Sequence, residues 1–223
     1  MIYITIIPAR GGSKRFPGKN IHEFMDKPLI AHSIDCSKQC SLISHTFVST
    51  DDVKIKQVSL QYGAEIIDRP IALGGDFTSS ADVMKNAVEQ LIAQGFVFDY
   101  VLLLQATNPL RPTGLLDEAI RIIEETKVDS LMTINRSELK LGKIVDNHFQ
   151  PWNYYYGQRS QDLDPLYYEN GLLYISSKKL LLRGKITSEN VYPMVVNHIF
   201  GEVDIDTRED MEFAKFIAKR YAE

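Results

Sequence analysis

The stretch YITIIPARGGSKRFPGKN (residues 3–20) joins a short apolar segment to a loop of glycines and basic side chains. Residues 3–9 are apolar and rich in β-branched side chains, which is typical of a strand buried on both faces of a parallel sheet. The loop that follows carries three glycines and four basic residues, Arg10, Lys14, Arg15 and Lys19. Because ligands of open α/β sheets bind at the carboxyl ends of the strands, the stretch predicts a parallel sheet with an anion-binding loop at that edge.

The alternation of strands and helices continues to residue 134. Further strands are predicted over 45–50, 64–68, 100–105 and 129–134, and helices over 28–40, 51–63, 79–95 and 113–126. A strand over 172–176, a helix over 177–184, a strand over 191–198 and a C-terminal helix over 208–222 complete the pattern. The expected fold class is therefore α/β, with three αβα layers around a mostly parallel sheet.

The segment over 136–168 interrupts this regularity. It is polar and aromatic, includes PWNYYYGQRSQDLDPLYY (residues 151–168), and shows no clean helical or strand period. A stretch of this length is too long for a simple loop in a compact domain. We expect one domain over residues 1–223, with this segment as an insertion that covers the active site or contacts a second subunit.

The composition excludes several classes of protein. With a net charge of −4 and 44% hydrophobic residues, the chain lacks the broad positive field of proteins that coat nucleic acid or anionic membranes. No apolar run approaches the roughly 20 residues of a membrane span, and the N-terminus has no signal-peptide pattern. Cys36 and Cys40 are predicted as buried core thiols of a reducing compartment. We expect a cytoplasmic protein that binds neither nucleic acid nor membrane.

The basic loop matches neither of two common nucleotide-binding motifs. A P-loop needs four residues between its first glycine and the Gly-Lys pair, followed by Ser or Thr, whereas Gly12 and Gly18 enclose five residues and Asn20 follows Lys19. The dinucleotide fingerprint also fails, because Gly11 and Gly12 are adjacent. The loop is predicted to cradle a triphosphate, since glycine amides and long basic side chains suit phosphate. A solvated basic turn is the alternative.

Six motifs in order make the chain similar to the acylneuraminate cytidylyltransferases. They are PARGGSKRFPGKN (8–20), VSTDD (48–52), RP (69–70) with TSSADV (78–83), LLLQATNPLRP (102–112), ENGLLYI (169–175) and DIDTREDMEFA (204–214). The resemblance covers essentially the whole chain. It implies a Rossmann-like nucleotidyltransferase fold and transfer of CMP from CTP to the anomeric hydroxyl of a nine-carbon 2-keto-3-deoxy sugar acid, N-acetylneuraminate or a related nonulosonate, with release of pyrophosphate.

The resemblance also implies which residues bind the nucleotide. Arg10 and Lys19 are expected at the triphosphate as catalytic residues, together with Asp206. The remaining nucleotide-binding residues are expected to be Ala9, Gly11, Gly12, Ser13 and Asn20 in the loop, and Arg69, Thr78 and Ser80 around the cytosine. Lys14 and Arg15 are either part of this site or flanking surface charge. Ser80 has a second interpretation as a helix N-cap.

Asp204 and Asp206 are expected to hold a divalent cation. In an extended segment, residues two apart project from the same face, and two carboxylates suit Mg²⁺. The family resemblance implies the same pair as metal ligands, with Mn²⁺ as an alternative ion. The general base stays open between Asp204, Asp206 and a metal-bound water.

Four residues are expected to bind the acceptor sugar: Gln105, Arg159, Asn170 and Tyr168. The resemblance implies that Arg159 pairs with the sugar carboxylate. Bacterial relatives commonly carry an arginine immediately before the ENG motif, where this chain has Tyr168. Because tyrosine cannot neutralise a carboxylate, the acceptor must depend more on Arg159, Lys140 or Lys143, or it must differ from sialic acid.

The expected partners are CTP, a nonulosonic acid and a second copy of the chain. The resemblance implies a homodimer formed through the 136–168 insertion. The competing interpretations are an octulosonate cytidylyltransferase, a sugar-1-phosphate nucleotidyltransferase and a non-catalytic nucleotide-binding protein on the same fold.

Overall fold

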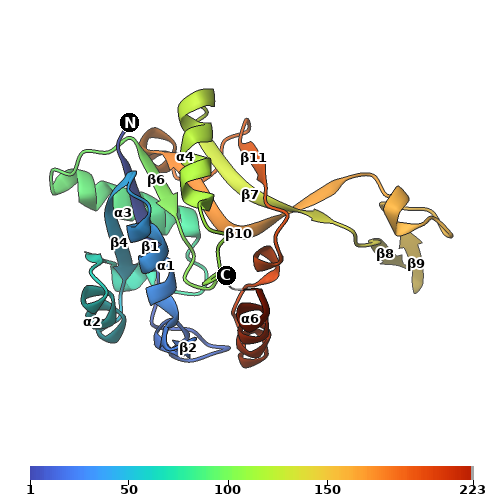
Figure 1. Cartoon of the computed structure of the whole chain (residues 1–223), viewed down its shortest axis with the longest axis horizontal. Coiled ribbons are helices and arrows are strands. Elements are labelled where there is room, and N and C mark those ends of the chain that lie inside the picture. Colours follow the sequence, from blue (N-terminus) through green and yellow to red (C-terminus); the bar gives the residue numbers. More distant parts are fainter. Residues whose placement is uncertain (222–223) are drawn as a thin grey trace.

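A seven-stranded sheet forms the centre of the computed structural model, which describes residues 1–221. Its strand order is β11-β7-β10-β6-β1-β4-β5 (Figure 1). The strands are β1 (Tyr3–Pro8), β4 (Ile43–Thr50), β5 (Glu65–Asp68), β6 (Tyr100–Leu103), β7 (Ser130–Ser137), β10 (Leu166–Ser177) and β11 (Tyr192–Val195). Strand β10 pairs antiparallel with β6 and β7, and the other pairings are parallel. The predicted mostly parallel α/β sheet is confirmed.

Helices cover both faces of the sheet. Helices α1 (Leu29–Gln39), α2 (Val53–Gln61) and α4 (Leu115–Thr126) pack on one face, and α3 (Ser80–Ala93) and α5 (Lys178–Leu182) pack on the other. Strand β1 contributes Ile7 to the first layer and Ile4 and Ile6 to the second, and all three are fully buried. This double burial explains why residues 3–9 show no polar alternation.

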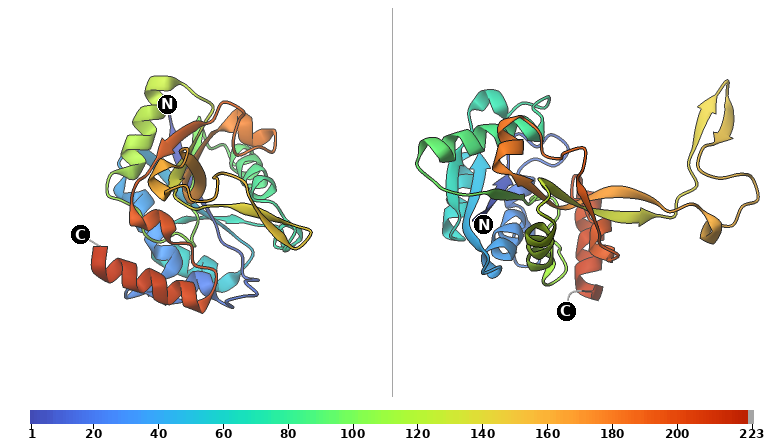
Figure 2. Two further views of the ribbon diagram at one scale, coloured as in Figure 1. Left: turned by 90° about the vertical axis from the view of Figure 1, so that its right-hand side faces the viewer. Right: turned by 90° about the horizontal axis from the view of Figure 1, so that it is seen from above.

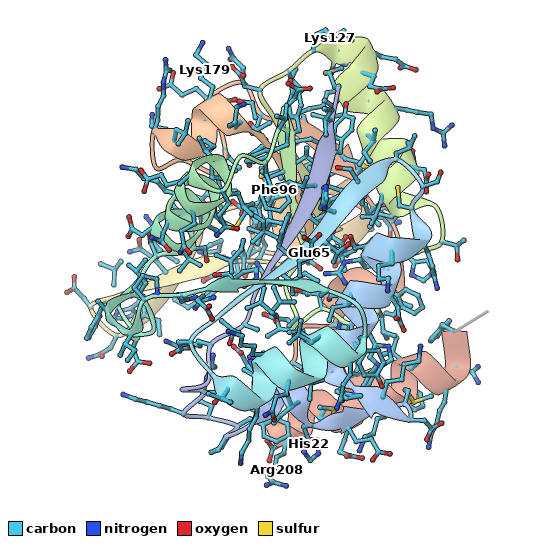
Figure 3. All side chains as sticks on the ribbon, turned by 90° about the vertical axis from the view of Figure 1, so that its left-hand side faces the viewer. His22, Glu65, Phe96, Lys127, Lys179 and Arg208 are labelled. Atoms are coloured by element: carbon cyan, nitrogen blue, oxygen red, sulfur yellow. The ribbon has the colours of Figure 1, made fainter. Side chains whose placement is uncertain are left out.

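A third apolar cluster joins the two ends of the chain. Helix α6 (Arg208–Tyr221) packs Met211 and Ala214 against Phe16 and Phe24, which lie in the opening loop and in the small β2 (Glu23–Phe24) and β3 (Lys27–Pro28) hairpin. The Phe16 ring lies between His22, in edge contact, and the Arg208 guanidinium, 5.3 Å from the ring centroid. Figure 3 shows His22 and Arg208 at one end of the molecule, with Lys127 and Lys179 at the other.

The insertion is more regular than predicted. Strands β7 and β10 continue past the sheet as a two-stranded ribbon in which Ser137 pairs with Leu166, and a second hairpin of β8 (Gly142–Val145) and β9 (His148–Pro151) lies beyond it. Figure 2 shows residues 138–165, here called the arm, projecting far from the sheet. The expectation of no strands here was wrong, because a ribbon without a buried face carries no alternating apolar pattern.

Two helix starts differ from the sequence interpretation. Ser79, not Ser80, caps α3, since its hydroxyl accepts a hydrogen bond from the Asp82 amide. Pro28 precedes α1 as its N-cap residue and does not form its first turn. Among residues 1–221, every helix is too short or too polar to cross a membrane.

We predict that the α4 core contributes strongly to stability. Ile120 on α4 is fully buried, whereas Ile71 in the 3-10 helix η2 (Ile71–Leu73) is 87% exposed. Ile120→Ala should lower the free energy of unfolding by about 2–5 kcal/mol, since it leaves a cavity. Ile71→Ala, the matched control, should change it by less than about 0.5 kcal/mol. Urea unfolding of both variants measures the difference, and equal losses would contradict the assigned layer.

Candidate active site

A basic pocket opens at the carboxyl edge of the sheet. This cavity of about 330 Å³ is lined by five basic side chains and two carboxylates. The basic residues are Arg10, Lys14, Arg15, Lys19 and Arg69, and the acids are Asp76 and Asp206. Ser13, Asn20, Thr78, Ser80, Gln105 and Thr107 also line it. The excess of positive charge suits a polyanion.

The basic side chains of the loop are paired with the two carboxylates. Lys19 Nζ lies 2.6 Å from Asp206 Oδ1, and Arg15 donates to the other oxygen of the same carboxylate. Across the pocket, Arg10 lies 3.1 Å and Lys14 2.5 Å from Asp76. Lys14 and Arg15 therefore belong to the pocket, a question that the sequence left open.

Backbone contacts hold the opening loop in place. The Ala9 amide donates to the Ser49 carbonyl over 2.9 Å, and the Asn20 side chain donates to the Arg10 carbonyl over 3.0 Å. The Gly11 amide donates to Asp51 Oδ1 over 3.0 Å. A phosphate at this amide would have to replace the Asp51 carboxylate. Ala9, Gly11 and Gly12 shape the loop but are not among the residues that line the cavity.

Arg69, Thr78 and Ser80, expected around the base, line the same cavity as the loop. Arg69 is 7% exposed and donates from its guanidinium to the Ser49 carbonyl over 2.8 Å. Burial lowers the pKa of Arg69 below its usual range. The structure thus places the predicted base-binding and phosphate-binding residues in one cavity.

A second, acidic pocket adjoins the first. It has a volume of about 350 Å³ and is lined by Gln105, Tyr168, Glu169, Asn170, Gly171, Tyr174, Gly201, Glu202 and Asp204. Gln105 lines both pockets, Asp206 lines the basic one and Asp204 the acidic one. The two predicted metal ligands therefore lie on either side of the junction.

The loop after β6 positions these two acids. The Ile205 amide donates to the Thr107 carbonyl over 2.9 Å, and the Asn108 side chain donates to the Val203 carbonyl over 2.7 Å. Partial burial raises the pKa of Asp204, and the nearby charge of Asp206 adds to that rise. A bound cation would relieve the repulsion between the two carboxylates.

Two carboxylates are a suitable but incomplete donor set for Mg²⁺, which commonly takes its other ligands from water and phosphate. Within residues 1–221, no group of three or more His, Cys, Asp or Glu side chains could hold a metal ion by itself. The residues present therefore fit a cation that arrives with a phosphate ligand.

Hydrogen bonds within the protein hold the Asn170 side chain in the wall of the acidic pocket. It is 6% exposed, its Oδ1 accepts from Thr133 Oγ1 over 2.6 Å, and its Nδ2 donates to Asn135 Oδ1 over 2.8 Å. Gly171 follows with φ 72°, a conformation that favours glycine. Protein contacts thus already use both ends of the Asn170 amide.

Arg159 is remote from both pockets within one chain. It lies on the arm beside the 3-10 helix η3 (Ser160–Asp162), where it makes a two-point ion pair with Asp162 at 2.7 and 3.0 Å. Lys140, also on the arm, donates to the Gln158 carbonyl. Tyr168, in contrast, lines the acidic pocket and donates to Glu202.

The sequence interpretation gave no role to Arg111, which fixes the residue shared by the two pockets. Its guanidinium donates to the carbonyls of Gln105 and Leu172 at 3.0 and 2.8 Å and to Ser33 Oγ at 3.0 Å. Its hydrogen bonds thereby connect the loop after β6 with β10 and α1. A single arginine in a loop gives no sequence signal for such a role, since two of its three acceptors, Ser33 and Leu172, come from distant segments.

Comparisons with known proteins show the family of this chain. A family profile described as Cytidylyltransferase matches residues 4–221. The chain belongs to the cytidylyltransferase family, which confirms the resemblance drawn from its motifs. Both the fold and the basic pocket agree with an enzyme that transfers a nucleotidyl group.

Three relatives illustrate the range of the family. The pseudaminic acid cytidylyltransferase of Campylobacter jejuni is 34% identical over 225 residues, 97% of this chain and 96% of that protein. The CMP-N,N'-diacetyllegionaminic acid synthase of Legionella pneumophila is 34% identical, covering 94% of this chain and 93% of that protein. The N-acylneuraminate cytidylyltransferase of Streptococcus agalactiae is 32% identical, covering 93% of this chain and 51% of that protein.

A solved structure shares the fold. CMP:2-keto-3-deoxy-manno-octonic acid synthetase, complexed with CTP, superposes with a TM-score of 0.74 over 99% of both chains at 17% identity. The predicted Rossmann-like nucleotidyltransferase fold is confirmed.

We predict that Gly11 is required for the shape of the opening loop. A Cβ at Gly11 would lie 2.6 Å from Asp52 Oδ2, whereas a Cβ at Gly12 would meet no atom within 4 Å. Asp52 cannot swing away freely, because it caps α2 by accepting from the Lys54 and Ile55 amides at 2.8 and 2.9 Å. Losing that cap costs about 1 kcal/mol.

Gly11→Ala should therefore raise the KM for CTP by about tenfold, a shift equivalent to about 1.4 kcal/mol, and Gly12→Ala should change it less than about twofold. Steady-state kinetics on both variants test this. Equal values for the two variants would show that Asp52 does not constrain the loop.

Proposed function

We propose that this enzyme transfers CMP from CTP to the anomeric hydroxyl of a nonulosonic acid and releases pyrophosphate. The observation that carries the proposal is the junction of a basic pocket and an acidic pocket at Gln105, with Asp204 and Asp206 on either side. A reaction between a polyanion and a sugar needs two adjoining sites of this kind. The sequence relatives act, by their names, on acceptors of this chemical class.

In the proposed reaction the anomeric oxygen forms a bond to the α-phosphorus as the bond to the bridging oxygen of pyrophosphate breaks. Arg10, Lys14, Arg15 and Lys19 would neutralise the phosphates, since phosphoryl transfer depends mainly on alignment and charge stabilisation. Lys19 and Arg15 would exchange Asp206 for phosphate oxygens on binding. The released carboxylate would then be free to hold a cation or to accept the hydroxyl proton.

Asp204 and Asp206 would hold Mg²⁺, or Mn²⁺ in its place. When bound, such an ion neutralises phosphate charge and lowers the pKa of a coordinated hydroxyl. This assignment is supported by the donor chemistry of the two acids and by the rise in the pKa of Asp204.

The acceptor is proposed within the nonulosonic acids and not as N-acetylneuraminate alone. The two relatives at 34% identity are named for pseudaminic and legionaminic acids, and Tyr168 stands where an arginine was expected. The octulosonate alternative is supported only by the shared fold, at 17% identity. Joint presence of Arg10, Lys19, Asp204 and Asp206 argues against a non-catalytic binding protein.

The arm is proposed to form a homodimer and to bring Arg159 to the acceptor. Trp152, Tyr155 and Tyr156 on the arm are 62%, 68% and 69% exposed, and a patch of exposed aromatics indicates an interaction surface. Arg159 lies on the same arm, remote from the pockets of its own chain. A cation supplied by a second copy would meet an acceptor carboxylate that the acidic pocket cannot neutralise.

The first test is a pyrophosphate-release assay with CTP, Mg²⁺ and a series of acceptors: sialic, ketodeoxynonulosonic, legionaminic, pseudaminic and octulosonic acids. We predict turnover with at least one nine-carbon acid. Lys19→Met and Asp206→Asn should each lower the rate by about 100-fold or more, because the first removes a positive charge that would neutralise the phosphates and the second a carboxylate that would hold the cation or accept the proton.

Lys179→Met is the matched control, since Lys179 is exposed at the opposite end of the molecule (Figure 3). It should leave the rate unchanged. Unaltered turnover in Lys19→Met, with thermal unfolding as in the wild type, would refute the assignment.

The second test concerns the arm. Arg159→Ala should raise the KM for the acceptor about tenfold or more and leave the KM for CTP within about twofold, because it removes a partner of the acceptor only. Equal effects on both substrates would contradict the carboxylate role.

Mixing Arg159→Ala with Lys19→Met then asks which subunit supplies the arginine. If the arm acts across a dimer, heterodimers contain one intact site, and a random equimolar mixture should recover about a quarter of the wild-type rate at low acceptor concentration. If the arm acts within its own chain, mixing restores nothing.

A further inference from the structure

The charged side chains of the acidic pocket are all hydrogen-bond acceptors. Its lining includes three carboxylates, Glu169, Glu202 and Asp204, and among the described residues that line it none is Lys, Arg or His. The carboxylate of a sugar acid would be repelled from this wall. The part of the acceptor that enters here must therefore carry hydrogen-bond donors.

Apart from Gln105, which lies at the junction of the two pockets, the side chains of the wall that can donate a hydrogen bond already donate to protein acceptors. The Tyr168 hydroxyl donates to Glu202 Oε1, and the Tyr174 hydroxyl donates to Glu169 Oε2 over 2.8 Å. Asn170 donates its Nδ2 hydrogen to Asn135. Burial, with a further contribution from the hydrogen bond to Glu202, raises the pKa of Tyr168 to about 12, so this hydroxyl keeps its proton at neutral pH.

Glu202 is held in a defined position at the end of the 3-10 helix η4 (Ile199–Glu202). Asn135 Nδ2 lies 3.4 Å from Glu202 Oε1, and the orientation of this amide is fixed because its Oδ1 accepts from Asn170. Gly201 permits this close approach, since a Cβ there would lie 2.5 Å from the Asn135 amide. The hydrogen bonds that residues 1–221 donate to Glu202 all end on Oε1, which leaves Oε2 for a ligand.

We propose that Glu202 determines acceptor specificity by accepting a hydrogen bond from an N–H group on the sugar. An amide N–H or an ammonium group donates without presenting a lone pair, whereas a hydroxyl also turns lone pairs toward the surrounding carboxylate oxygens. The enzyme therefore prefers nonulosonic acids with an amino or acylamino substituent at this point over those with a hydroxyl. This inference depends on the proposed function and names the feature of the acceptor that the site recognises.

Tyr168 acts through Glu202 as a positioning residue. Its hydroxyl donates to Glu202 Oε1 and so orients this acid with Oε2 available to a ligand.

The test compares acceptors that differ in one group. The wild type and Glu202→Gln are assayed by pyrophosphate release with the nonulosonic acid that the wild type uses best, and with analogues in which each acylamino group in turn is replaced by a hydroxyl. The wild type should prefer the acylamino compound in kcat/KM for one of these replacements. In Glu202→Gln that preference should fall about tenfold or more, with the KM for CTP unchanged.

Tyr168→Phe should lower the same preference by a smaller factor, because Glu202 remains but loses its anchor. Glu118→Gln, an exposed acid on α4, is the control and should leave the preference unaltered. Thermal unfolding of each variant separates a change in recognition from a loss of fold.

The outcomes separate the two proposals. Turnover in the wild type with an unchanged preference in Glu202→Gln, or an equal loss for every acceptor, would overturn this inference and leave the proposed function in place. An absence of pyrophosphate from the wild type with every nonulosonic acid would overturn both.

Discussion

The ion pair between Lys19 and Asp206 is the contact on which the site depends. It joins the loop after the first strand to the segment before the last helix, residues separated by 187 positions in the chain. Lys19 is only 7% exposed, and a buried ammonium without a partner is costly. The apolar cluster of Phe16, Phe24 and Met211 brings the two segments together and partly excludes water from the pair. Each of the two charges therefore requires either the other or a ligand of opposite charge.

Because of this requirement, the ion pairs of the site resemble the contacts expected with its proposed ligands. Asp206 and Asp76 form ion pairs with the basic side chains of the loop, as phosphates would. Lys19 and Arg15 in turn neutralise Asp206, as a divalent cation would. Binding of a nucleotide with its metal would exchange one set of ion pairs for another with little change in buried charge. Preorganised charges of this kind stabilise developing charge without reorganisation during the reaction.

The two pockets differ in the charge of their lining side chains. Five basic side chains gather in one, and three carboxylates line the other, with Gln105 between them. Arg111 holds that junction through neutral acceptors, so it adds no ion pair to either pocket. In the proposed function the acidic wall would repel the carboxylate of the acceptor, and Arg159 on the exposed arm is the cation proposed to neutralise it.

The sequence alone determined the layers of the fold and the residues of the opening loop. Double burial of β1 leaves a continuous apolar run in the sequence, and the apolar faces of α1, α3 and α4 leave a helical period, because each position contacts neighbours set by local geometry. The arm strands left no such record, since a ribbon with two solvent faces imposes no alternation. The tertiary structure alone decided that Arg15 and Asp76 belong to the site, that Arg111 fixes Gln105, and that Tyr168 orients Glu202. Most of those contacts join segments distant in sequence, and their energies depend on burial and charge that no local pattern encodes.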